Sequence, residues 1–191
     1  MAGDDFFRRN QLWSRAEIVG DPCPIPRSSG AYAWFFRETP PRVPSVGCFQ
    51  RDGLTLLYVG ISPKEPTPGK KPSKETIQSR LRDHMGNTNA EGSTVRMTLG
   101  CLLSDALGIR LHRSGKRFTF GEGEAVLNEW LGRNAFVTWT LDPEPWHLEK
   151  RLIAALDLPL NIQGNSRHPF YPILKNIRGR AKAVGRAAAS V

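Results

Sequence analysis

The segment LTLLYVGI, residues 54–61, is the strongest strand signal in the sequence, and GAYAWFF at 30–36 is the second. Both are short, rich in aromatic or β-branched residues and bounded by turn-forming residues, which is typical of strands. The first is apolar enough to be mostly buried, and AFVTWTL at 135–141 predicts a third strand. We therefore expect a small, largely antiparallel central sheet of three strands.

Helices are expected to flank this sheet. Ile77, Leu81 and Met85 lie at i, i+4 and i+8 and predict a helix over about 76–85. The other predicted helices span about 94–107, 122–132 and 142–156. The last should begin at Asp142-Pro143, because aspartate caps helices and proline suits their first turn. This order of elements predicts an α+β fold with helices packed on the sheet.

Long insertions interrupt these elements. The segment SPKEPTPGKKPSK at 62–74 contains four prolines and four lysines, which predicts a mobile basic loop with nothing to pack. Loop or helical insertions are also expected at 37–53, with a small hairpin as an option, and at 86–121, which ends in a polar, basic excursion. The predicted organisation is an extended strap at 1–27, a compact domain at 28–165 and a basic C-terminal extension at 166–191.

The charge distribution favours a polyanionic partner. The 191-residue chain has 27 Lys or Arg against 18 Asp or Glu, a net charge of +9. No acidic residue follows Asp157, whereas six basic residues do. Basic side chains that neutralise phosphates release counterions, so nucleic acid is the expected partner class. Charge alone does not distinguish this protein from a basic protein that binds no anion.

Several classes of protein are disfavoured by composition. No segment approaches the roughly 20 apolar residues that a membrane span needs, and the first residues lack the apolar core of a secretory signal. The three cysteines, Cys23, Cys48 and Cys101, lie far apart and match neither a disulfide framework nor a thiolate zinc site. We therefore expect a cytoplasmic protein with free thiols and no membrane partner.

Glu149 is the first candidate for chemistry. It falls on the expected inward stripe of its helix, three residues after Trp146 and four before Ile153, with Leu156 continuing the stripe. An inward carboxylate is unfavourable unless it is paired or binds a metal ion. The alternatives are an ion pair, or a carboxylate at the edge of the stripe that extends to solvent.

Arg80 and His84 form the second candidate. They are four residues apart and share one face of the predicted helix at 76–85. Arginine binds phosphate through two parallel hydrogen bonds, and histidine transfers protons near neutral pH. A solvated basic face would explain the same pair without any function.

Tyr32 and Tyr58 lie in the first two strands, with Gly30 and Gly60 beside them. Glycine in a strand often marks the close approach of a ligand or of another backbone. Two core tyrosines with satisfied hydroxyl groups would produce the same pattern.

Together these segments resemble the motifs of the GIY-YIG nucleases. The five matching segments, in the family's order, are Gly30-Ala31-Tyr32, Tyr58-Val59-Gly60, Arg80 with His84, Glu149, and Leu158-Pro159-Leu160-Asn161. The resemblance covers about residues 28–165. Ala31 replaces a larger aliphatic residue that is usual in the family, and the insertions separate the motifs more widely than usual.

The resemblance implies a metal-dependent endonuclease that hydrolyses phosphodiester bonds in DNA, with a single Mg²⁺ or Mn²⁺ ion. Glu149 would bind the ion, and Arg80 would stabilise the charge that develops on the phosphate. A tyrosine is the proposed general base in the family. In this chain Tyr32, Tyr58 and His84 all remain open as the group that takes a proton from water.

The resemblance also suggests roles for residues around this centre. Asn161 is expected to orient a tyrosine or a water molecule. The expected contacts to the nucleic-acid backbone are Lys64, Lys70, Lys71, Lys74 and Arg82. The arginines of the tail would make similar contacts, so truncation after Lys175 is expected to weaken binding and reduce its salt dependence.

Two other hypotheses fit the same motifs. The chain would be a non-catalytic nucleic-acid-binding module on the same fold, or a structural domain in which Glu149 and Arg80 pair with each other. The oligomeric state is open, although cutting both strands with one site per chain would favour a homodimer or sequential nicking.

Overall fold

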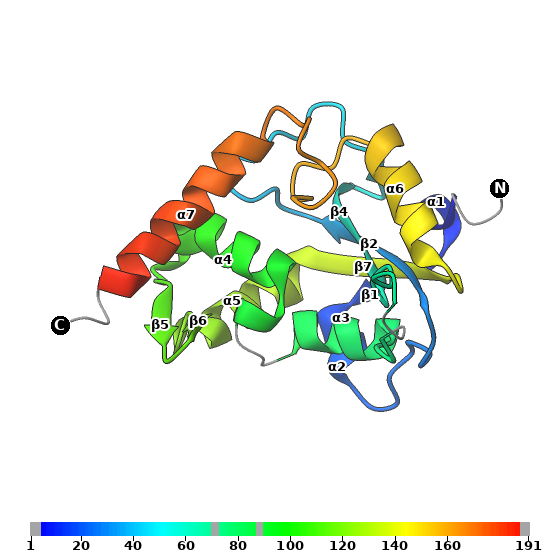
Figure 1. Ribbon diagram of the computed structural model, residues 1–191, viewed down its shortest axis with the longest axis horizontal. Coiled ribbons are helices and arrows are strands. Elements are labelled where there is room, and N and C mark those ends of the chain that lie inside the picture. Colours follow the sequence, from blue (N-terminus) through cyan, green and yellow to red (C-terminus); the bar gives the residue numbers. More distant parts are fainter. Residues whose placement is uncertain (1–4, 70–72, 87–89, 188–191) are drawn as a thin grey trace.

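The three predicted strands form the centre of one sheet. In the computed structural model, residues 5–69, 73–86 and 90–187 are described. The strand order is β1 (Trp13–Ser14), β7 (Ala135–Leu141), β2 (Gly30–Phe36), β4 (Leu54–Ser62) and β3 (Gln50–Arg51). Every neighbouring pair is antiparallel, so the predicted α+β class is confirmed, with five strands in place of three (Figure 1). The two additional strands have only two residues each and lie at the edges.

The central strand β2 is buried on both faces. One core contains Tyr32, Trp34 and Phe36, and the other contains Ala31, Ala33 and Phe35. This alternation follows from the two-residue period of a strand, and it requires a layer of helices on each face.

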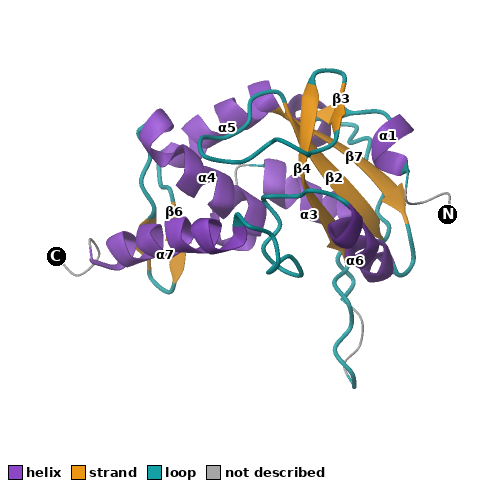
Figure 2. Cartoon of the chain, turned by 90° about the horizontal axis from the view of Figure 1, so that it is seen from above, coloured by secondary structure: helices purple, strands orange, loops and turns teal. Residues whose placement is uncertain are grey.

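Helices provide both layers. Their bounds are α1 (Phe6–Arg9), α2 (Arg15–Val19), α3 (Ile77–Met85), η1 (Ala90–Gly92), α4 (Thr94–Leu107), α5 (Gly123–Asn134), α6 (Pro145–Ala155) and α7 (Tyr171–Ala187). On one face, α1 and α6 bury Phe6, Phe7, Leu148 and Leu152. Residues of α3, α4, α5 and α7 pack in the core on the other face (Figure 2). The sheet therefore separates α6 from α3, and these two helices carry the candidate residues Glu149 and Arg80.

Helix α3 begins where its sequence predicts. The side chain of Thr76 accepts a hydrogen bond from the backbone N–H of Ser79, and Ser79 Oγ accepts one from the N–H of Thr76. This reciprocal cap satisfies two backbone donors at the start of the helix. Ile77, Leu81 and Met85 are fully buried, as their spacing predicts.

Two expectations for α6 were wrong. The helix begins at Pro145 and not at Pro143, because Asp142 Oδ1 instead accepts the N–H of Glu144 at 2.8 Å in a preceding turn. Its deepest side chains are Leu148 and Leu152. Trp146, Glu149 and Ile153 are half-buried at the edge of that stripe.

The inserted segments contain more structure than their composition suggests. Residues predicted as an extended strap include α1, α2 and the edge strand β1. Asp52 and Gly53, with φ of 54° and 73°, make the tight turn that pairs β3 with β4, so the optional hairpin is present. The polar excursion at 108–121 forms a hairpin of β5 (His112–Ser114) and β6 (Arg117–Thr119), anchored by the buried side chains of Ile109, Leu111, Phe118 and Phe120.

Helix α7 is part of the packed structure. Leu174 is fully buried, and a Cβ atom at Gly185 would lie 2.5 Å from the carbonyl oxygen of Leu111. Truncation after Lys175 would therefore remove a packed helix together with its charges, so it does not isolate an effect on binding. Among the described residues, no helix is both long and apolar enough to cross a membrane.

Candidate active site

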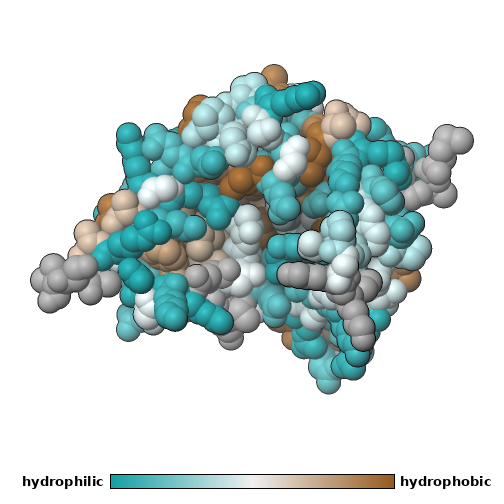
Figure 3. Space-filling model, in the orientation of Figure 1, coloured by the Kyte–Doolittle hydropathy of each residue, from teal (hydrophilic) through white to brown (hydrophobic). Residues whose placement is uncertain are grey.

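A cleft of about 1120 Å³ lies beside β4 and brings the main candidate residues together. Tyr32, Tyr58 and Arg80 line it from the face of the sheet that α3 covers, and Glu149 lines it from α6. In Figure 1, α6 and α7 stand on either side of β4. Figure 3 shows this face as largely hydrophilic, with apolar surface visible between the α6 and α7 sides.

The glycines beside the two tyrosines are required by close approach. A Cβ atom at Gly60 would lie 2.6 Å from the hydroxyl oxygen of Tyr32, so the tyrosine ring lies directly across β4 at this residue. A Cβ atom at Gly30 would lie 2.2 Å from the carbonyl oxygen of Thr140 in β7. Both glycines therefore have the role that their position in the strands indicates.

His84 lies behind Tyr32 and does not line the cleft. Its Nε2 atom is 3.0 Å from the hydroxyl oxygen of Tyr32, and the side chain is fully buried. Burial lowers the pKa of His84 well below its usual value, and nearby Arg80 and Arg96 act in the same direction, so the ring is neutral. The buried Nδ1 atom has no hydrogen-bond partner in the described structure. An orphaned lone pair costs less than an orphaned N–H, so the favoured tautomer donates Nε2–H to Tyr32.

Arg80 is positioned at the cleft by contacts with Gly92 and Glu75. Its side chain is 15% exposed, its Nη1 donates to the carbonyl of Gly92 at 3.2 Å, and Nη1 lies 3.7 Å from a carboxylate oxygen of Glu75. The ion-pair partner of Arg80 is therefore Glu75, and no ion pair with Glu149 is present among the described residues. The hypothesis of a structural pair between Arg80 and Glu149 is wrong.

Glu149 is a half-buried carboxylate that faces the cleft. Burial raises the pKa of Glu149 to about 7, and the charges of Lys64 and Lys150 oppose this rise. Lys150 itself is paired with Glu65, at 2.8 Å. In the described part of the chain, no hydrogen-bond donor or cation pairs with the Glu149 carboxylate.

Comparison with protein-family models identifies the chain. The model described as the GIY-YIG catalytic domain matches residues 30–180, which is most of the sequence. The chain belongs to the GIY-YIG family. No curated protein and no solved structure matches it significantly. Membership indicates a nuclease-type function and a nucleic-acid substrate, and the matched range includes the first part of α7.

The terminal asparagine of the GIY-YIG motifs has a backbone partner. Asn161 Oδ1 accepts the N–H of Val59 at 2.9 Å, and Asn161 Nδ2 donates to the carbonyl of Val59 at 2.8 Å. Both ends of the amide are thus bonded to the residue that follows Tyr58. Asn161 lines the cleft, but its amide orients the strand that carries Tyr58, and among the described residues it makes no hydrogen bond to a tyrosine hydroxyl.

The two motif tyrosines differ in their electrostatic environment. Burial raises the pKa of Tyr32 well above its usual value, and the neighbouring Tyr58 adds to this rise. Burial and the charge of Glu149 raise the pKa of Tyr58 to about 12, while Arg80 and a hydrogen bond from Tyr32 lower it. Tyr58 is also the less buried of the two. Arg80 lowers the pKa of both tyrosines, so the clearer difference is that the hydroxyl group of Tyr58 is the more accessible.

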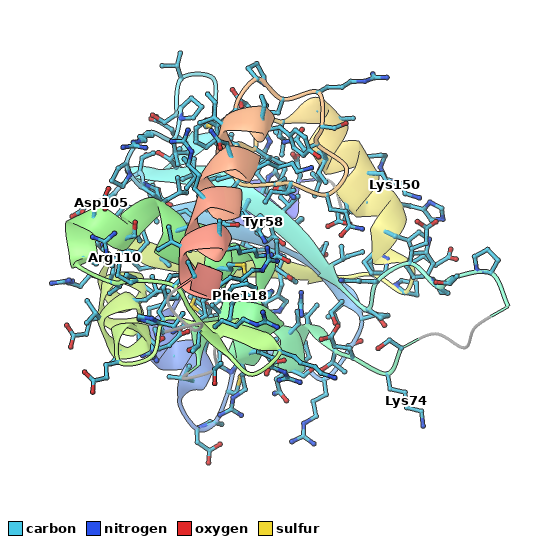
Figure 4. The ribbon with its side chains drawn as sticks, turned by 60° about the vertical axis from the view of Figure 1, so that its left-hand side comes forward. Tyr58, Lys74, Asp105, Arg110, Phe118 and Lys150 are labelled. Carbon is cyan, nitrogen blue, oxygen red and sulfur yellow. The ribbon has the colours of Figure 1, made fainter. Side chains whose placement is uncertain are left out.

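Only some of the basic residues predicted to contact nucleic acid lie at or near the cleft. Lys64 lines the cleft, and Lys74 is exposed on the loop that extends beside α6 in Figures 2 and 4. Lys70 and Lys71 lie outside the described residues. Arg82 is exposed on the opposite side of α3 from Arg80, where its Nη2 donates to the carbonyl of Val19. Arg82 is therefore placed away from the cleft.

One important residue was missed in the sequence. Arg96 is fully buried in α4, and its guanidinium bonds Glu124 at 2.7 Å and the side-chain oxygen of Asn128 at 2.7 Å. The same group donates to the carbonyl of Gly86 at 3.3 Å, which supports the end of the helix that carries Arg80 and His84. An arginine inside the apolar run VRMTL was the signal that could have revealed it.

The donor set of the cleft fits a hard divalent cation. A single carboxylate, with water molecules completing the coordination, is a common arrangement for Mg²⁺. A cation would also compensate the desolvated charge of Glu149, which has no partner among the described residues. No group of three or more His, Cys, Asp or Glu side chains suited to a metal ion occurs in residues 5–69, 73–86 and 90–187.

Proposed function

We propose that the protein is a metal-dependent endonuclease that hydrolyses phosphodiester bonds in DNA, with Mg²⁺ or Mn²⁺ bound by Glu149. The observation that carries this proposal is the convergence of Glu149, Arg80, Tyr32 and Tyr58 on one cleft of the GIY-YIG domain. The alternative function, a non-catalytic binding module, gives no reason for a half-buried carboxylate without a partner beside two tyrosines.

Each candidate site residue has a defined role in this proposal. Arg80 binds the scissile phosphate and offsets the negative charge that develops on its oxygens. Tyr58, once ionised, accepts the proton of the attacking water, and Tyr32 stabilises the phenolate by donating its hydroxyl hydrogen. His84 positions Tyr32 from behind. The divalent ion would supply positive charge to the phosphate and to the leaving oxygen.

Access to the cleft supports Tyr58 as the base over His84. His84 is neutral, but it is fully buried, and its Nε2 is occupied by Tyr32. A general base must come within hydrogen-bond distance of the water that it deprotonates. Tyr58 lines the cleft where this water would bind, and its pKa of about 12 must fall, which positive charge near Glu149 would promote.

Cleavage of DNA tests the proposal directly. Plasmid and branched DNA would be incubated with Mg²⁺ or Mn²⁺ and wild type, Glu149→Gln, Arg80→Ala or Tyr58→Phe. Each of the three variants should lose at least 10²-fold in rate. Glu129→Gln and Arg133→Ala are matched controls, because both side chains are exposed on α5, and they should cut like wild type. Wild type that binds DNA but cuts none of these substrates faster than the variants would favour the binding module.

A further inference from the structure

Helix α7 carries a guanidinium group that has no role in the mechanism above. Arg178 is half-buried where α7 packs on α4, with Nη1 donating to Thr98 Oγ1 at 3.1 Å and Nη2 to Met97 Sδ at 3.6 Å. The Thr98 hydroxyl donates to the carbonyl of Thr94 at 2.8 Å, so it is fixed as an acceptor for Arg178. Thr94 lines the cleft, one helical turn away.

The charge of Arg178 has no counter-ion in the described structure. Both of its hydrogen-bond partners, Thr98 and Met97, are neutral. Burial lowers the pKa of Arg178, and its neighbours Cys101 and Tyr58 only partly oppose this. A partly desolvated cation with unused donors is unfavourable until an anion binds it.

Arg96, which joins α4 to α5, provides the contrast. Its guanidinium is more deeply buried, but Glu124 neutralises it and Asn128 and backbone carbonyls accept its remaining donors. Arg96 is therefore complete as a structural group. Arg178 is only half-buried and has no carboxylate partner among the described residues, which leaves its guanidinium able to take an anion from outside the chain.

The position of Arg178 indicates which anion this is. Arg178 is bonded to Thr98, one helical turn from the cleft residue Thr94, and its positive charge lowers the pKa of Tyr58. Arg178 itself does not line the cleft, whereas Arg80 lines it from α3. A nucleic-acid strand in the cleft carries one phosphate for each nucleotide, and Arg80 would hold only one of them.

We propose that Arg178 binds a backbone phosphate of the substrate strand, next to the phosphate held by Arg80. This inference rests on the proposed function. It extends the path of the strand from the cleft toward α7, and it defines the substrate as a strand of at least two phosphates and not a single nucleotide. Two guanidinium groups on different helices would fix the direction of the strand across Tyr58 and Glu149.

The salt dependence of binding tests the phosphate contact without requiring cleavage. A short fluorescein-labelled DNA duplex would be titrated in EDTA at several NaCl concentrations with wild type, Arg178→Gln and Arg178→Lys. Loss of one phosphate contact should reduce the slope of log K against log salt by about 0.9 for Arg178→Gln. Arg178→Lys should keep most of the slope. An unchanged slope for Arg178→Gln overturns the proposal.

Arg180 gives a matched control on the same helix. It is exposed and lines a separate hollow of about 530 Å³ between α7 and α4, with Ile173 and Arg110. Arg180→Gln removes the same charge, so an equal loss of slope in this variant would indicate a general charge effect and overturn a specific contact. Urea unfolding of both variants separates loss of binding from loss of folding.

A neutral phosphate analogue locates the contact. At a mapped cleavage site, the phosphate next to the scissile one is replaced by methylphosphonate. Wild type should lose at least tenfold in kcat/KM, and Arg178→Gln should lose little further. If the losses caused by the methylphosphonate and by Arg178→Gln are additive, the proposed contact is overturned. It is also overturned if Arg178→Gln changes only the pH midpoint of cleavage. If wild type cuts nothing, the nuclease proposal fails, while the salt slope still decides the role of Arg178.

Discussion

Replacing Glu149 with glutamine should stabilise the protein at alkaline pH when no divalent ion is present. Burial raises the pKa of Glu149 from 4.5 to about 7 in the folded chain. Glutamine has nearly the same shape and no charge, so it removes the unfavourable desolvated carboxylate. Enzymes often hold such groups because function requires them at the expense of stability.

The size and pH window of the effect follow from this pKa. Below pH 4.5 the carboxyl group is protonated in both states, and the substitution should change little. Between pH 4.5 and about 7 the unfolded chain loses this proton first, which favours unfolding of wild type by about 1.4 kcal/mol for each pH unit. Above about pH 7 the difference should level off at about 3 kcal/mol, with Glu149→Gln the more stable.

Urea unfolding in EDTA at pH 5 and pH 8, followed by tryptophan fluorescence, measures this difference. Glu129→Gln, an exposed change on α5, should stay within about 0.5 kcal/mol of wild type at both pH values. Added Mg²⁺ should stabilise wild type at pH 8 and leave Glu149→Gln unchanged, because only the carboxylate binds the ion. An advantage for Glu149→Gln that is equal at pH 5 and pH 8 would refute the reasoning.

Three further outcomes are expected. Gly60→Ala should displace the ring of Tyr32, destabilise the fold by about 1–3 kcal/mol and reduce cleavage, whereas retention of full activity would contradict the close approach. Asn161→Ala should cost about 1–3 kcal/mol in urea unfolding, because two backbone groups of Val59 lose their partners, and an unchanged midpoint would count against this. At low Mg²⁺ concentration, cleavage should rise with pH through about 7 as Glu149 ionises, and its midpoint should move to lower pH as Mg²⁺ is increased. A midpoint independent of Mg²⁺ would show that another group controls the profile.

The parts of the fold that local sequence could predict are those with local causes. The three long strands are marked by aromatic and β-branched runs, and α3 is marked by its apolar spacing and by Thr76 at its start. The edge strands β1 and β3 have only two residues each, which is too short for a periodic pattern in the sequence. They are stabilised by pairing with β7 and β4. The hairpin after α4 was obscured by its charges, although Phe118 and Phe120 alternate as strand residues do.

The candidate site was predictable to a similar extent. The motifs placed Tyr32, Tyr58, Arg80 and Glu149 together, and the structure brings all four to one cleft. Their partners could not be inferred, because contacts such as Asn161 with Val59 join residues 102 positions apart. Arg178 was counted only as one of several basic residues in the tail. Its distinctive property is burial without a carboxylate, which appears only when α7 is packed on α4.

The bond between Asn161 and Val59 also affects how copies of this chain can associate. One edge of β4 pairs with β2, and β3 covers the other edge only near Leu54. Further along, the N–H of Leu160 bonds the carbonyl of Leu57 at 3.1 Å, and Asn161 occupies both backbone groups of Val59. This segment therefore blocks an edge that could otherwise recruit a strand from another molecule and start aggregation. A dimer that cuts both DNA strands must consequently form through a different surface.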